Sequence, residues 1–195
     1  ETEHTAYALA LTASGLLVHA YWGPRLPRAD DYPVPVDCRG WASFSGSGHR
    51  MAEEYPAYAG AKYTEPCLKT TFADGVRDTV LRFAGAEVQN GDKLTLRVTL
   101  HDGYYPLAVT LCYRAHEQRD LIERWVEISN TGDTPVNLER VLSALWHLPW
   151  GESYRLSYLT GRWLDEWQIC REPLQTGVKA IESRRLTTSH AFNPW

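Results

Sequence analysis

The stretch "KLTLRVTL", residues 93–100, decides the fold class because apolar and polar residues alternate along it. The alternation places the leucines and the valine on one face and the threonines and the arginine on the other, as in a half-buried β-strand. Similar runs follow at 107–117 and 121–129, and "NTGDTP" at 130–135 is a strong turn signal before 136–150. These four runs predict four strands in an antiparallel meander.

The N-terminal part continues the β pattern. Residues 7–23 contain two short strand-like runs separated by "TASG" at 12–15, the composition of a hairpin loop. Prolines interrupt 24–66, and "SFSGSGHR" at 43–50 indicates an exposed excursion rather than a second domain. Because no helical apolar stripe persists for three turns, we expect a single all-β sandwich domain over 1–195 with little helix.

Composition excludes several classes of partner. The formal net charge is −4 with interspersed signs, which argues against the basic surface that binds nucleic acid. No apolar run approaches the roughly 20 residues of a membrane-spanning helix, and no signal-peptide pattern opens the chain. We therefore expect no membrane partner and a cytoplasmic location. Secretion stays open because the sequence starts at Glu1 rather than Met.

Cysteine and histidine spacing gives no support for a metal or cofactor. The four cysteines are scattered without a C-x-x-C pair: Cys38, Cys67, Cys112 and Cys170. The seven histidines show no H-x-H or H-x-x-x-H spacing. We therefore expect buried free thiols, no metal and no cofactor.

Catalytic patterns are equally weak. The sequence has no G-x-S-x-G elbow and no phosphate-binding glycine loop. Three pairs of adjacent carboxylates occur: Asp30 and Asp31, Glu53 and Glu54, and Asp165 and Glu166. Neighbours on a strand point to opposite faces, so these pairs are interpreted as solvated surface groups.

The aromatic content points to sugars. Eight Trp and eleven Tyr accompany a single Met. A sugar presents apolar C–H faces and a hydroxyl rim, which a flat aromatic ring with nearby charges complements. The segment "YLTGRWLDEWQICREP" at 158–173 combines these groups, with Trp163 and Trp167 available for stacking. The alternative is that both tryptophans belong to the core.

Five segments occur in an order that resembles the N-terminal β-supersandwich domain of family 36 glycoside hydrolases, the α-galactosidases. They are "EYPAYAGAKYTEP" (54–66), "FADGVRDTVLRFAG" (72–85), residues 119–149, "LTGRWLDEW" (159–167) and "IESRRLTTSHAFNPW" (181–195). The resemblance implies a galactose mutarotase-like fold. It also implies that the chain is the N-terminal part of a longer retaining enzyme, with both catalytic aspartates in a (β/α)8 barrel and no catalytic residue here.

In this family the domain lends a wall to the galactose pocket. The resemblance implies substrate-binding roles for Trp163, in the G-x-W element, and for Arg77, after a D-G turn. Where the family reads G-D-F-R, this chain has Ala-Lys-Tyr-Thr, so Lys62 replaces the substrate-binding acid and Tyr63 follows it. A lysine in place of the acid removes a hydrogen-bond acceptor and adds donors, so the usual contact with a sugar hydroxyl cannot be made in the same way.

The resemblance also implies partners. These are α-galactoside oligosaccharides, the chain's own catalytic barrel and a homo-oligomer, a tetramer in the family. Arg184, Arg185 and His190 are expected to join the sandwich to the barrel.

Two alternatives remain open. One is a stand-alone β-sandwich that binds sugars or partners without chemistry. The other is a mutarotase-like epimerase, for which His101, His116 and Glu127 are the candidates.

Overall fold

The computed structural model describes residues 1–35, 51–59, 64–91, 93–149, 151 and 153–183. The chain forms two compact units, residues 1–148 and 149–195, and each is described by itself. The single domain over 1–195 therefore stays a prediction. Strands dominate both units, and the helix within the described residues is confined to two three-residue 3-10 turns, Ala29–Asp31 and Glu117–Arg119. The prediction of an all-β protein is confirmed.

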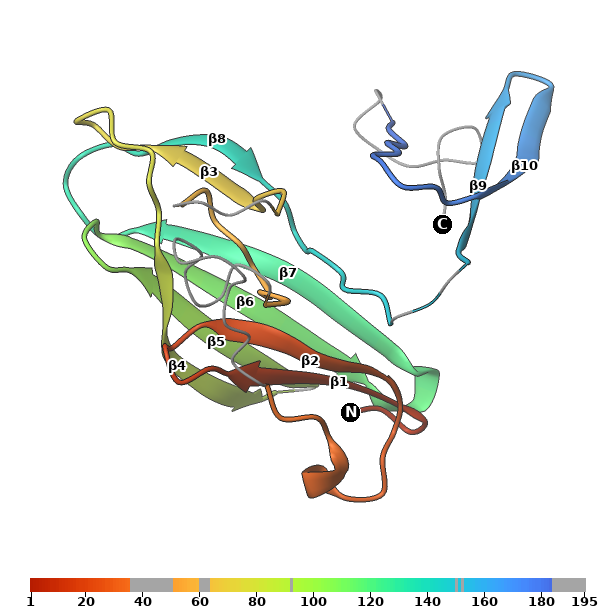
Figure 1. The fold of residues 1–195 in the computed structure, drawn as a ribbon, viewed down its shortest axis with the longest axis horizontal. Coiled ribbons are helices and arrows are strands. Elements are labelled where there is room, and N and C mark those ends of the chain that lie inside the picture. The colour runs from red at the N-terminus through yellow and green to blue at the C-terminus, as the bar shows by residue number, and fades with distance from the viewer. Residues whose placement is uncertain (36–50, 60–63, 92, 150, 152, 184–195) are drawn as a thin grey trace. The chain divides into compact units, whose positions relative to one another are not determined.

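The first unit consists of antiparallel strands arranged in three sheets (Figure 1). The strands are β1 (Thr5–Leu11), β2 (Leu17–Pro24), β3 (Leu68–Thr71), β4 (Leu81–Asn90), β5 (Leu94–Asp102), β6 (Leu107–His116), β7 (Leu121–Asn130) and β8 (Asn137–Val141). The largest sheet has the order β4-β5-β6-β7, and β1 with β2 and β3 with β8 form two-stranded sheets.

Three strands of the predicted meander are confirmed as β5, β6 and β7, which pair antiparallel with nearest neighbours. The fourth member of this sheet is β4 at the other edge, so the prediction that 136–150 continues the meander is wrong. That segment forms only the short strand β8, which pairs with β3 instead. Alternation is a local property that specifies a strand, whereas the hydrogen-bonding partner depends on the tertiary fold.

The predicted N-terminal hairpin is confirmed as β1 and β2. Its turn contains Gly15 at a φ of 77°, a left-handed conformation that glycine adopts without steric cost. The Thr12 hydroxyl accepts a hydrogen bond from the Leu16 amide at 3.1 Å, which closes the loop.

The core of the first unit lies on the apolar face of the four-stranded sheet. Alternate residues of β5 and β6 supply Val98, Leu100, Val109 and Leu111, all buried. Side chains from β2, β3 and residues 55–57 pack against them. At about 25 cal/mol per Å² of apolar surface, this burial is the main source of stability.

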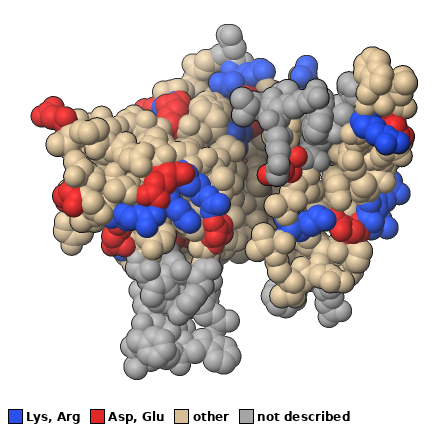
Figure 2. All heavy atoms as spheres, turned by 90° about the horizontal axis from the view of Figure 1, so that it is seen from above, with Lys and Arg blue, Asp and Glu red and all other residues tan. Residues whose placement is uncertain are grey.

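Charged groups gather on the outer surface. Figure 2 shows acidic and basic side chains intermingled on the face it presents. On the polar face of the four-stranded sheet, the Arg97 guanidinium binds both oxygens of Glu127, at 3.0 and 2.5 Å. In the part of the chain that the structure describes, no helix has the length and apolar character needed to span a membrane.

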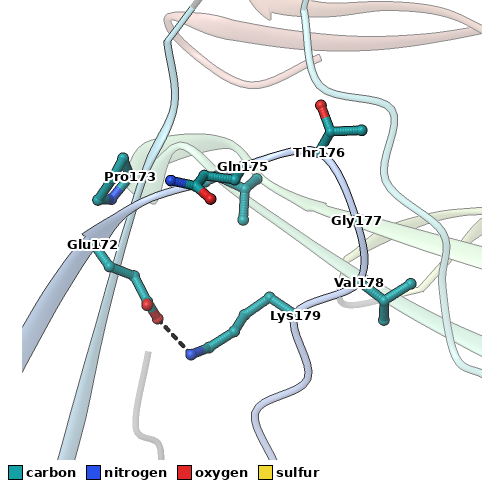
Figure 3. Close-up of a pocket in the computed structure, with 8 residues that line it drawn as sticks. Glu172, Pro173, Gln175, Thr176, Gly177, Val178 and Lys179 are labelled. Carbon is teal, nitrogen blue, oxygen red and sulfur yellow. Dashed lines mark ion pairs between the residues drawn. The ribbon is translucent and has the colours of Figure 1, made fainter.

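The second unit contains the antiparallel hairpin of β9 (Arg155–Arg162) and β10 (Asp165–Pro173). From the end of β10 onward, residues 172–179 curve around an open cavity of about 380 Å³ (Figure 3). Glu172 and Lys179 form an ion pair of 2.8 Å across it. The two charged side chains of this cavity therefore neutralise each other.

The prediction of buried free thiols is confirmed for Cys67 and Cys112 and wrong for Cys170, which is free but only partly buried. Cys170 lies in a two-stranded hairpin, which is too small to enclose its own side chains. Cys38 lies outside the described residues.

Candidate functional site

Arg77 belongs to a mixed aromatic and charged surface of the first unit. It follows a turn in which Gly75 has a φ of 86°. Its guanidinium binds the Glu139 carboxylate of β8 through two hydrogen bonds, of 3.1 and 2.5 Å. The same guanidinium lies 5.3 Å from the centre of the Tyr58 ring, and the Lys69 ammonium lies 5.9 Å from it. We call Tyr58, Lys69, Arg77 and Glu139 the Arg77 surface.

This surface has the chemistry of a sugar-binding wall. The Tyr58 ring is 46% exposed, so part of it is open to a ligand. A hydrogen bond from Thr71 and the fork from Arg77 lower the pKa of Glu139, which keeps it an ionised acceptor. A flat ring flanked by cations and an acceptor matches the C–H face and the hydroxyl rim of a pyranose. Sequence analysis missed Tyr58, although it lies in the "EYPAY" segment that carried part of the resemblance.

Tyr58 lies in residues 53–59, which backbone hydrogen bonds join to neighbouring strands. The Tyr58 amide donates to the Leu68 carbonyl at 2.9 Å, and the Tyr58 carbonyl accepts from the Thr79 amide at 3.0 Å. The Pro56 carbonyl accepts from the Cys67 amide at 2.7 Å. Tyr58 therefore lies between β3 and the segment that leads into β4.

Near the start of residues 53–59, Glu54 takes part in a buried network. We call this network the Glu54 clamp; its members are Tyr7, Glu54, Tyr113 and Arg124. The Glu54 carboxylate accepts hydrogen bonds from the Tyr7 hydroxyl at 2.8 Å and the Tyr113 hydroxyl at 2.7 Å. It also pairs with Arg124 at 2.8 Å, and the Glu54 and Arg124 side chains are 0% and 2% exposed. A second Arg124 nitrogen donates to the Glu54 carbonyl at 3.1 Å. One arginine thus holds both the side chain and the backbone of Glu54.

Electrostatics in the clamp are set by burial. Burial raises the pKa of the Glu54 carboxyl, while Arg124 and the two tyrosine hydroxyls act in the opposite direction. Burial also raises the pKa of Tyr7 and of Tyr113, so both keep the protons that they donate. The Arg124 guanidinium lies 5.2 Å from the Tyr113 ring and 5.5 Å from the Trp146 ring.

The clamp corrects one sequence interpretation. The Glu53–Glu54 pair was expected to be solvated, but both residues are buried. A buried carboxylate requires partners, and Arg124 supplies the charge from an inward position of β7. The sequence signal was an arginine at an apolar position of the alternating run 121–129.

Trp163 lies at the tip of the β9–β10 hairpin and is 85% exposed. Trp167 is 63% exposed, so the interpretation of both tryptophans as core residues is wrong. Leu164 and Trp167 have φ values of 65° and 63°, which bulky side chains rarely adopt. A Cβ at Gly161 would lie 2.8 Å from the Asp165 carbonyl oxygen, so the tip requires glycine there. The hairpin therefore presents an indole to solvent on a locally strained backbone.

The predicted substrate-binding residues occupy different places. Arg77 lies in the first unit and Trp163 in the second, and each is described within its own unit. Lys62 and Tyr63 lie outside the described residues. The expected junction residues, Arg184, Arg185 and His190, lie outside them too.

The epimerase candidates do not form an acid–base pair. Glu127 is held by Arg97, whose hydrogen bonds lower the pKa of Glu127 to about 2. His116 pairs with Glu123 at 3.2 Å rather than with Glu127. His101 is exposed and lies near the C-terminal end of β5. His116 contacts Lys93, which lies just before the N-terminal end of β5. A carboxylate with so low a pKa is a poor proton acceptor near neutral pH. The described residues also contain no group of three or more metal-binding side chains.

Comparisons with known proteins agree with the fold. AgaA, an α-galactosidase of Geobacillus stearothermophilus, is 32% identical over 97% of this chain, which spans 29% of the length of AgaA. AgaSK of Mediterraneibacter gnavus, a bifunctional α-galactosidase and sucrose kinase, is 29% identical over 99% of this chain, which spans 23% of its length. A crystal structure of an AgaA variant with stachyose superimposes with a TM-score of 0.83 at 27% identity, covering all of this chain and 30% of that one.

The chain thus spans less than a third of the length of these relatives. Residues 15–195 match the glycosyl hydrolase family 36 N-terminal domain. Together with the all-β fold, this match shows that the chain belongs to the family of glycosyl hydrolase family 36 N-terminal domains.

Proposed function

We propose that this chain is the N-terminal domain of a retaining α-galactosidase, in which it completes the galactoside pocket and supports oligomer assembly. The observation that carries the proposal is the family match over residues 15–195. Further support comes from relatives named as α-galactosidases, one of them crystallised with stachyose. The catalytic carboxylates of the complete enzyme would lie outside this chain.

Four residues are proposed to contact the substrate: Trp163, Arg77, Lys62 and Tyr63. The exposure of Trp163 supports this role, because an indole open to solvent can stack on a pyranose. Arg77 is already bound to Glu139, so we propose that it presents the remaining guanidinium edge and the adjacent Tyr58 ring. The partners proposed are α-galactoside oligosaccharides, the catalytic barrel and a second copy of the enzyme.

The test is hydrolysis of an aryl α-galactoside by the complete enzyme. The wild-type enzyme should release the aryl group, and Trp163→Ala should raise KM with a smaller effect on kcat. A stacking contact of about 0.5–1.5 kcal/mol corresponds to an increase of about 2- to 13-fold. Ile169→Ala is the matched control, because Ile169 is an exposed apolar residue on the same hairpin away from the tip.

Two results would count against the proposal in different ways. Absence of hydrolysis of any aryl α-galactoside by the complete wild-type enzyme would remove the assigned activity. An unchanged KM for Trp163→Ala would remove only the pocket role of this residue. Measurable galactose affinity of the 195 residues alone would favour the stand-alone sugar-binding alternative, because a pocket split between domains binds weakly when halved.

A further inference from the structure

The Glu54 clamp is poorly suited to the sole purpose of stabilising the fold. The free energy needed to take two fully buried charges out of water is of the same order as the free energy that their attraction returns. The Nε atom of Arg124 is also buried without a hydrogen-bond partner among the described residues. Apolar side chains of similar volume would often stabilise a core as well or better. What an ion pair with several hydrogen bonds adds is a single permitted geometry.

That geometry defines the register of residues 53–59. A shift by one residue would replace the Glu54 side chain in the clamp by Glu53 or Tyr55. Such a shift would also exchange the exposed Tyr58 for Ala57 or Ala59, which are buried alanines on either side. Within residues 53–59 only Tyr58 is exposed, so among these three registers the one with Glu54 in the clamp presents an aromatic ring at this point.

We propose that Tyr58 is a substrate-contacting residue of the galactoside pocket, and that Glu54 and Arg124 are positioning residues that hold it in place. This inference rests on the function proposed above. The clamp holds Glu54, the segment runs through Pro56 bound to the Cys67 amide, and Tyr58 emerges under the Arg77 and Lys69 cations. The half-exposed ring then offers its apolar face to the sugar.

The ligand chemistry follows from these groups. The ring offers an apolar face for pyranose C–H groups, the two cations donate to hydroxyls, and Glu139 accepts from a hydroxyl. The net charge of Lys69, Arg77 and Glu139 is positive, so a neutral or anionic sugar fits better than an amino sugar.

The first test measures KM and kcat of the complete enzyme with an aryl α-galactoside. Tyr58→Ala should raise KM about 3- to 10-fold, whereas Tyr58→Phe, which keeps the ring, should stay within about twofold of the wild type. Glu54→Gln should also raise KM. Its effect should vanish in the Tyr58→Ala background, because a positioning residue acts only through the group that it positions.

A control separates positioning from general loss of stability. Leu111→Ala removes a fully buried side chain of β6 outside the clamp, so it lowers thermal stability but should leave KM unchanged. If Glu54→Gln fails to fold, Tyr113→Phe removes one hydrogen bond to Glu54 and serves in its place. Additive effects of Glu54→Gln and Tyr58→Ala on KM would overturn the positioning role. An unchanged KM in Tyr58→Ala would overturn the substrate contact.

A second measurement needs no substrate. Hydrogen exchange in the complete enzyme should accelerate at the amides of Tyr58 and Thr79 in Glu54→Gln, relative to Leu111→Ala. Equal exchange at these amides in the two variants would refute the positioning role, even if the enzyme hydrolyses no α-galactoside. Activity of the wild type and exchange in the variants therefore test the proposed function and this inference separately.

Discussion

Removing one charge of the Glu54–Arg124 pair should destabilise the first unit strongly. The two side chains are 0% and 2% exposed, so water cannot solvate the charge that is left. Breaking a buried pair by removing one partner costs about 3–5 kcal/mol. Arg124→Met should reach this range, since Glu54 would keep only the hydroxyls of Tyr7 and Tyr113. Glu54→Gln should cost less than Arg124→Met, because the amide oxygen can still accept from the tyrosines.

The double variant separates charge pairing from packing. With both charges removed, the cost should fall below the sum of the single costs by about 2 kcal/mol, within the range of coupling for groups in direct contact. Native-state hydrogen exchange at the buried β6 amides of Val109 and Leu111 reports the opening free energy of the first unit. Single costs below about 1 kcal/mol, or strict additivity in the double variant, would show that the pair is solvated and would refute this reasoning.

Two further predictions concern titratable groups. Hydrogen bonds from His4 and Thr2 lower the pKa of Asp120 to about 2, and the same pairing raises the pKa of His4 above 6.5. The contribution of the His4–Asp120 pair to stability should therefore be complete between pH 3.8 and pH 6.5, the ordinary pKa values of the two groups. It should decline as pH falls toward 2, where Asp120 takes up a proton, and as pH rises through the raised pKa of His4, where the imidazole loses its proton. An NMR titration in which Asp120→Asn leaves the pKa of His4 unchanged would contradict the pairing. Burial raises the pKa of the Cys67 thiol to about 12 and that of Cys112 to about 11, so iodoacetamide at pH 8 should modify neither in the folded protein and both in urea. Rapid labelling of either cysteine without urea, detected by peptide mass spectrometry, would show that this thiol is accessible in the folded protein and would contradict the prediction.

Much of the fold was predictable because strand patterns are local. The alternation in residues 93–100, 107–117 and 121–129 sets which side chains face the core, and it reappears as β5, β6 and β7. The hairpin of β1 and β2 was also predictable, because a turn with Gly15 acts over a few residues. The pairing of β8 with β3 was not, since both strands are short and 65 or more residues separate them in the sequence.

The candidate site was also predictable only in part. Resemblance to a family identified Arg77 and Trp163, but no local pattern could show that Tyr58 lies under Arg77 or that Trp163 is 85% exposed. Those facts depend on which segments surround each side chain. An aromatic residue has the same sequence signature in a core and on a binding surface.

The sequence by itself determined the first hairpin, the strands β5, β6 and β7, and the family. Only the tertiary structure decided that Glu54 is buried and that Arg124, 70 residues away, neutralises it. The physical reason is that alternation and turns involve neighbours in the chain, whereas the partner of a buried charge is whichever group the closed fold brings within hydrogen-bonding distance.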